Sequence, residues 1–365
     1  MIRSCYIHIP FCKKICSYCD FCKLFYDTGY VLSYLDSLDE EILKNYQEEE
    51  LNTIYIGGGT PSCLSICELK YLFSILSRFK RSKDCEITIE ANFDSITKEK
   101  IDLFLEFGIN RISFGMETTH EWILKKMNRS LDLSYVKEII CYCREKGLTN
   151  INLDLMYAFP GESIQEVEED VSFLLSLDVN HISTYSLILE EHTSLYLQHS
   201  SLVDEDMDAR MYQRICEMLK DYVHYETSNF AKDGKYSRHN LCYWNNWEYY
   251  GFGLGASGYI LNIRYANTRS MTHYLQGNYR YQEEKLSTYD KMEYEVILNL
   301  RTKWGISKNK FFQFYGKNLE EVYPYQKLID QGYLIEKDDN IIIPYSYWYL
   351  SNEIIVKLLE GCCYE

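Results

Sequence analysis

The chain has 365 residues and carries 38 Lys and Arg against 54 Asp and Glu, so its formal net charge is −16. Its apolar fraction of 46% and aromatic fraction of 15% exclude a disordered chain and predict a sizeable packed core. A nucleic-acid partner is also disfavoured, because binding a polyanion usually needs a basic face, although a local basic pocket for a small anion stays open.

The 14 cysteines are unevenly distributed, and five of them lie within the first 22 residues. The start of the chain has no apolar segment of the kind found in signal peptides, and no run of about 18 apolar residues predicts a membrane span. We therefore expect a cytoplasmic protein with reduced thiols, whose clustered cysteines are first of all candidate metal ligands.

The first half of the chain alternates short β-branched or aromatic runs with longer amphipathic segments. Apolar residues spaced by three and four predict a helix in each of five of these segments. Repeated strand–helix alternation implies a parallel sheet, either an open doubly wound sheet or a partly closed barrel. The six expected strands lie near residues 5–9, 53–56, 86–90, 111–114, 150–155 and 181–186.

The pattern changes after residue 186, where helices, loops and a hairpin replace the alternation. The last helices and the hairpin predict a small winged-helix-like domain, which the acidity of the chain argues against as a DNA-binding unit. The expected elements are a helix at 206–219, a strand near 224–228, loops over 231–258, helices at 291–300 and 318–331, and a hairpin over 333–343. The expected divisions are a barrel over 1–230, a linking segment over 231–280 and a C-terminal domain over 281–365.

Cys12, Cys16 and Cys19 form a C-x3-C-x2-C motif directly after the first expected strand. Three thiolates on one loop can bind three irons of a cubane cluster and leave the fourth iron open to a ligand. Zinc motifs normally bring two cysteine pairs separated by a dozen or more residues, so an iron–sulfur cluster is favoured over zinc or loose thiols. Cys22 as a fourth ligand would close the open iron. We therefore favour a position of Cys22 beside the cluster, where it is not a ligand.

Further polar residues and glycines follow successive strands and are expected to meet at one end of the barrel. In a parallel barrel the chemistry lies at the carboxyl ends of the strands. Glycines there allow close approach of the backbone to a ligand, although a tight turn explains them equally well. The carboxylates could instead be solvated or cap helices. The residues at this end are Gly58, Gly59, Glu90, Glu117 and Asp154.

The segment YIHIPFCKKICSYCDF at residues 6–21 resembles the opening of radical SAM proteins of the oxygen-independent coproporphyrinogen III oxidase family. The segments at 57–61, 86–90, 110–115 and 151–155 follow in the order of that family, and the resemblance spans essentially the whole chain. It implies a partial (β/α)6 barrel with a small C-terminal domain, in agreement with the six expected strands.

The resemblance also implies that Cys12, Cys16 and Cys19 hold a [4Fe–4S] cluster. Arg129 would then bind the methionine carboxylate of S-adenosylmethionine, and the carboxylates would accept from its ammonium and hydroxyl groups. Glu117 stands where the family usually has Gln, which leaves the orientation of S-adenosylmethionine open. The implied S-adenosylmethionine positions are Tyr6, Gly58, Gly59, Thr60, Glu90, Arg129 and Asp154, with Tyr18 beside the cluster.

The segment RHNLCYW at residues 238–244 resembles the HNxxYW signature of the haem chaperone, or HemW-like, branch of the family. The decarboxylase branch has a longer N-terminal arm. His239 is thus a candidate axial haem ligand, and Tyr243 and Trp244 are candidate walls of a haem site. The alternative is that His239 is a hydrogen-bonded structural residue and Trp244 belongs to the core. Ser257 replaces a histidine that is usual in the branch.

The expected function is binding of haem and its delivery to acceptor haemoproteins. The alternative is oxidative decarboxylation of coproporphyrinogen III through a 5′-deoxyadenosyl radical, and a zinc-stabilised binding module is a third class. No catalytic residue is assigned. An electron donor of flavodoxin or ferredoxin type would serve the cluster, and any contact with a membrane would be peripheral, through an acceptor.

Overall fold

The computed structural model describes residues 2–198 and 202–362, and its main feature is a nine-stranded sheet in the order β11-β1-β4-β5-β6-β7-β8-β10-β9. Neighbouring strands from β1 through β8 in this order are parallel. The six predicted strands are therefore confirmed, and the sheet ends at β11 and β9 instead of closing on itself, as a partial barrel does. Their bounds are β1 Ser4–Ile9, β4 Leu51–Gly58, β5 Arg81–Asn92, β6 Arg111–Glu117, β7 Ile151–Tyr157 and β8 His181–Ser186.

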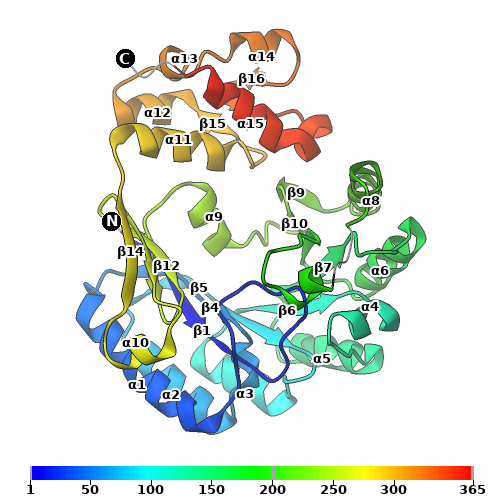
Figure 1. Cartoon of the computed structure of the whole chain (residues 1–365), viewed down its shortest axis with the longest axis vertical. Helices are drawn as coiled ribbons and strands as arrows, with labels where there is room; N and C mark the ends of the chain where they lie inside the picture. Colours follow the sequence, from blue (N-terminus) through cyan, green and yellow to red (C-terminus); the bar gives the residue numbers. More distant parts are fainter. Residues whose placement is uncertain (1, 199–201, 363–365) are drawn as a thin grey trace.

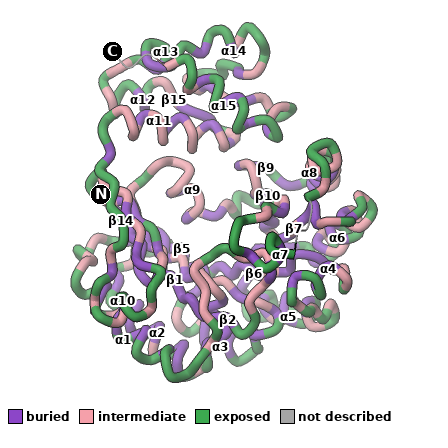
Figure 2. Tube along the Cα trace, in the orientation of Figure 1, coloured by how far each residue is buried: buried purple, intermediate pink, exposed green. Residues whose placement is uncertain are grey.

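Helices follow the parallel strands and cover the outer face of the sheet (Figure 1). Their apolar faces pack on the strands, where burial is concentrated (Figure 2), and residues such as Ile54, Phe104 and Leu153 are completely buried. Removing this apolar surface from water is the main favourable contribution to folding. The five predicted helices are α1 Thr28–Asn45, α2 Ile66–Leu76, α3 Lys98–Phe107, α5 Leu133–Glu145 and α6 Ile164–Ser176, and a short α4 covers Glu121–Lys126.

Shorter strands complete the barrel region. β11 (Tyr250–Phe252) runs parallel to β1, whereas β10 (Asn229–Ala231) runs antiparallel to both β8 and β9 (Val223–Glu226). The pair β2 (Phe11–Cys12) and β3 (Leu24–Phe25) joins the two ends of the cysteine loop. This pairing fixes the base of the loop at the end of β1.

The prediction of loops over 231–258 is wrong for β11 and for α9, which covers Arg238–Trp244. The Ser237 hydroxyl caps this helix by accepting from the Asn240 amide, and the buried Glu86 carboxylate accepts from the amides of Arg238 and His239. A segment of low helix propensity becomes helical here because a tertiary partner satisfies its first amide groups.

The last part of the chain forms two further sheets and a second hydrophobic core. That core lies within residues 292–358, apart from the first core at 2–279. The predicted hairpin is confirmed, but the expected helix at 318–331 is two short helices separated by Pro324, which cannot continue a helix. The two cores support the proposed C-terminal domain.

Most of the remaining elements are labelled in Figure 1. They are α7 Ser194–Leu197, α8 Glu205–Met218, β12 Ser257–Ile260, β13 Ile263–Asn267, α10 Met271–Leu275, β14 Arg280–Lys285, α11 Thr288–Asn299, β15 Ile306–Ser307, α12 Lys308–Tyr315, α13 Leu319–Val322, α14 Gln326–Asp330, β16 Ile335–Lys337, β17 Asn340–Ile342 and α15 Ser351–Glu360, with 3-10 turns η1 Pro61–Cys63 and η2 Tyr345–Leu350. Within the described residues, none of the helices has the length and apolarity needed to cross a membrane.

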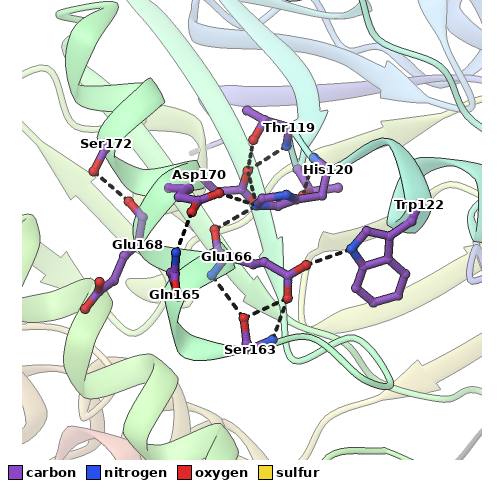
Figure 3. A network of polar contacts seen from close by, with 11 residues as sticks. Thr119, His120, Trp122, Ser163, Gln165, Glu166, Glu168, Asp170 and Ser172 are labelled. Atoms are coloured by element: carbon purple, nitrogen blue, oxygen red, sulfur yellow. Dashed lines mark hydrogen bonds and ion pairs between the residues drawn. The ribbon is translucent and has the colours of Figure 1, made fainter.

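A polar network anchors the loop after β6 to helix α6 (Figure 3). The fully buried Asp170 carboxylate accepts from the Thr118 hydroxyl and the Thr119 amide, each at 2.6 Å. Nearby, the Trp122 indole donates to Glu166 at 2.7 Å. These bonds fix the segment directly after Glu117, the last residue of β6, and so hold the end of that strand in place.

Substitution Asp170→Asn tests this anchor. The amide group keeps the size of the side chain but replaces charge-assisted acceptors with one oxygen and a donor, so we expect the free energy of unfolding to fall by about 2 kcal/mol. Urea denaturation followed by circular dichroism measures the change. Glu169→Gln, at the largely exposed neighbouring residue of α6, is the matched control and should change stability little; equal effects of the two substitutions would contradict the anchoring role.

Candidate functional site

The cysteine loop between β2 and β3 is held against the end of α4 and the residues that follow it. The Ser17 amide donates to the Met127 carbonyl at 3.1 Å, and the Ser17 hydroxyl donates to the Lys126 carbonyl at 2.8 Å. The Asn128 side chain donates to the Ile15 carbonyl at 3.0 Å. The Ser17 amide and the Ile15 carbonyl of the loop are thus paired with this neighbour, which holds the loop in place.

The thiols of Cys12, Cys16 and Cys19 are free and lie close enough to influence one another electrostatically. Burial raises the pKa of Cys12 to about 11 and also raises the pKa values of the other two, so bound iron would displace their protons. A Cβ atom on Gly59 would lie 2.9 Å from Cys12 Sγ, so only glycine permits this approach.

These residues fit a cluster with three thiolate ligands. Within the described residues no three His, Cys, Asp or Glu side chains form a single-ion site. A cubane cluster distributes its thiolates over different irons and occupies more space than one ion. Three free thiols on one loop are a donor set that suits such a cluster.

Arg129 joins the cysteine loop to the end of β6. Its guanidinium lies 3.7 Å from Cys16 Sγ, forms an ion pair with Glu117 at 2.8 Å and donates to the Gly115 carbonyl at 2.9 Å. Glu117 also accepts from the Tyr18 hydroxyl at 3.3 Å. Burial raises the pKa of Glu117 to about 7, while the Arg129 charge opposes that rise. The cation predicted for a methionine carboxylate is thus already paired with a carboxylate of the protein.

Glu90 lies on β5 beside the glycine run that ends β4. Its carboxylate accepts from the Gly58 amide at 3.0 Å and from the Tyr55 hydroxyl at 2.8 Å. Thr60 accepts from Asn92 at 3.1 Å, so the turn after the glycines is tied to the same strand. The predicted neighbours Gly58, Thr60 and Glu90 are therefore brought together.

Asp154 lies opposite Gly115 in the pairing of β6 with β7. Asn152 donates to its carboxylate at 2.8 Å, and burial raises its pKa. Its charge also raises the pKa values of Glu90 and Glu117. This end of the barrel thus gathers three coupled carboxylates, which provide acceptors for ammonium and hydroxyl groups.

Tyr6 and Cys22 connect β1 to the far side of the cysteine loop. The Tyr6 hydroxyl is hydrogen-bonded to His8 Nδ1 at 2.9 Å, and His8 Nε2 donates to the Cys22 carbonyl at 2.7 Å. A Cβ atom on Gly255 would lie 2.8 Å from Cys22 Sγ. The Cys22 side chain is also hydrogen-bonded to Arg269. Cys22 therefore packs against the 253–255 turn, an arrangement that suits a role beside the cluster.

His239 is buried on α9, and both of its ring nitrogens have partners. Nδ1 is hydrogen-bonded to the Thr53 hydroxyl at 2.8 Å and Nε2 to the Tyr243 hydroxyl at 2.7 Å. Burial lowers its pKa to about 3, and its ring lies 5.2 Å from that of Tyr55. This is the hydrogen-bonded setting named above as the alternative, so a bond to haem iron would require Nε2 to give up Tyr243. Ser257 lies exposed at the start of β12.

The two aromatic residues of the motif face different cavities. Trp244 lines a cavity of about 400 Å³ between the barrel and the C-terminal domain, whereas Tyr243 lines one of about 130 Å³ beside Arg264. Trp244 is also hydrogen-bonded to the buried Glu226. The motif therefore reaches a space of ligand size through its last residue.

Three polar residues of the site escaped the sequence analysis. Asn92 lies two residues after Glu90 on the same strand, and this spacing places both side chains on one face. Tyr55 lies opposite Tyr6 in the pairing of β1 with β4. Arg111 is buried at the start of β6, and its charge lowers the pKa of Glu90 against the stronger effect of burial. Of the three, only Asn92 could have been found from the sequence, through its spacing of two residues from Glu90.

Comparisons with known proteins concern the sequence and the fold of the chain. The radical SAM superfamily pattern matches residues 6–174, and the HemN C-terminal domain pattern matches residues 286–343. The structure of the Escherichia coli coproporphyrinogen III oxidase HemN, a radical SAM enzyme, superimposes with a TM-score of 0.87 at 20% identity, covering 97% of this chain and 89% of that one. The shared fold is thus the partial barrel with its C-terminal domain.

Full-length relatives are similar at higher identity. Heme chaperone HemW of Bacillus subtilis is 37% identical over 98% of this chain and 99% of the relative, and that of Lactococcus lactis is 38% identical over 98% and 97%. Heme chaperone HemW of Escherichia coli is 32% identical over 95% and 94%. The chain therefore belongs to the heme chaperone HemW family of the radical SAM superfamily.

Proposed function

We propose that the chain binds haem and delivers it to acceptor haemoproteins in the cytoplasm or at the membrane surface. One observation carries the proposal: the chain is 32% identical to the Escherichia coli protein named a heme chaperone but only 20% identical to the coproporphyrinogen III oxidase of the same organism. The oxidase shares the fold, and fold alone does not determine function.

We propose that Cys12, Cys16 and Cys19 hold a [4Fe–4S] cluster and that S-adenosylmethionine binds across the ends of β4 to β7. When bound, the reduced cluster would supply the electron for cleavage of S-adenosylmethionine, and a flavodoxin or ferredoxin would reduce it. Arg129 would orient the carboxylate. The groups proposed to surround S-adenosylmethionine are Tyr6, Tyr18, Gly58, Gly59, Thr60, Glu90, Glu117 and Asp154.

We further propose that haem lies beside α9, with Trp244 and Tyr243 as aromatic neighbours. This placement is supported by the resemblance of the α9 segment to the branch signature, together with the cavity beside Trp244. His239 fixes α9 to the barrel through Thr53, and it becomes a ligand only if its bond to Tyr243 opens.

Haem titration of the anaerobically reconstituted full chain tests the function. We expect a saturable Soret band at about one haem per chain. His239→Ala should change the position or intensity of that band, and His273→Ala, on the exposed face of α10, should not. Absence of saturable binding by the wild type would contradict the proposed function, whereas identical spectra of wild type and His239→Ala would remove only His239 from the site.

Glu117→Gln tests the competition for Arg129. The neutral side chain no longer neutralises the guanidinium, so we expect S-adenosylmethionine to bind on the order of tenfold more tightly, about 1.4 kcal/mol. Anaerobic equilibrium dialysis measures the dissociation constant without turnover. Glu121→Gln, in the exposed first turn of α4, is the matched control. Weaker binding to Glu117→Gln would show that the Glu117 carboxylate itself contacts S-adenosylmethionine.

A further inference from the structure

A cavity of about 400 Å³ lies where the barrel meets the C-terminal domain. Its size is within the range of small-molecule sites. The barrel contributes the ends of β7 and β8 and helix α8, and the linking segment contributes helix α9. The C-terminal domain contributes the segment after α11, η2 and the start of α15. These elements come from sequence positions nearly 200 residues apart.

Aromatic side chains form much of the wall. Trp244 approaches from α9, Tyr212 from α8 and Trp348 from η2. The hydrogen bond of Trp244 to Glu226 fixes the indole, and Trp348 donates to the Ile343 carbonyl at 3.0 Å. Aromatic side chains held in this way suit contact with one edge of a flat ring, and the rest of the lining is polar.

Arg301 is the cation of this cavity and has a neutral partner. Its guanidinium donates to the Asn352 side chain at 2.8 Å, and within the described residues it makes no ion pair. Burial lowers its pKa, with no carboxylate opposing that effect. A half-buried guanidinium without an anion is a ready partner for a carboxylate of a ligand.

Asp208 is the acidic residue of the lining, and its carboxylate has partners other than Arg301. The Ser186 hydroxyl donates to it, and it is also hydrogen-bonded to Tyr349. Its charge adds to the effect of burial in raising the pKa of Tyr349 to about 12. The cavity therefore offers aromatic walls and one unneutralised cation.

We propose that this cavity receives one edge of a porphyrin, with Arg301 pairing with a propionate and Trp244 and Trp348 contacting the ring. The inference rests on the proposed function and adds a site to it, since it places the anionic edge of haem on a residue outside the α9 motif. Because Arg301 belongs to the C-terminal domain and Trp244 to the linking segment, haem bound here would contact both parts of the chain.

Arg301→Gln tests the proposal in the full chain. Haem titration followed at the Soret band should show affinity reduced on the order of tenfold, as expected for loss of one charge-assisted contact. The dimethyl ester of haem, which lacks the propionate charges, should bind wild type more weakly than haem does. The dimethyl ester and haem should bind to Arg301→Gln about equally well. Arg210→Gln, exposed on α8 and lining a different cleft, is the matched control.

A second variant, Asn352→Asp, tests the site even where Arg301→Gln fails to fold. Asn352 is exposed, and Asn352→Asp would place a carboxylate against the guanidinium that its amide oxygen already contacts. This change should weaken haem binding without removing Arg301, and Asn318→Asp at the exposed start of α13 is its control.

The outcomes separate the two proposals. Wild type that binds haem while both variants bind it equally well, with no discrimination of the ester, would overturn the Arg301 site and leave the proposed function standing. Wild type that binds no haem would overturn both. Selective loss in Arg301→Gln and Asn352→Asp supports the site.

Discussion

The arrangement of the site depends on the contacts of the Arg129 guanidinium, which is largely shielded from solvent. It contacts a cysteine of the cluster loop, a carboxylate at the end of β6 and a backbone carbonyl of that strand. A charge is buried at a cost unless it is paired, so its neighbours are fixed along with it. The parallel strands supply the remaining groups at the same end of the sheet. One cation thus connects the loop that suits a cluster with the strand ends that suit S-adenosylmethionine.

The net charge of −16 is unfavourable for the binding of anionic ligands. Both proposed ligands carry carboxylates, and the field of an acidic protein does not attract them. Binding must therefore depend on local cations held in defined positions. Arg129, the cation proposed for one end of the barrel, is already paired with Glu117. Arg301, the cation proposed for the junction with the C-terminal domain, has only a neutral partner. A ligand carboxylate at Arg129 must compete with the Glu117 carboxylate, whereas one at Arg301 competes only with the neutral Asn352 side chain.

Much of the architecture could be predicted because it follows from periodic patterns. Short β-branched or aromatic runs identified the strands, and apolar residues spaced by three and four identified the helices between them. The position of Gly58, Glu90 and Asp154 at strand ends predicted that they lie at one end of the sheet. The α9 helix was missed because its stability comes from the Glu86 carboxylate, a contact that no local pattern records. The same limit applies to His239, whose hydrogen bonds to Thr53 and Tyr243 depend on tertiary packing, and to the pairing of Arg129 with Glu117.

The central claim is that this chain carries haem and is not a decarboxylase, although it shares the fold of one. The most direct measurement gives anaerobically reconstituted protein coproporphyrinogen III, S-adenosylmethionine and a reductant, with the Escherichia coli oxidase as the positive control. The account predicts no protoporphyrinogen from this chain while the control turns over. Clear formation of protoporphyrinogen by this chain would contradict it.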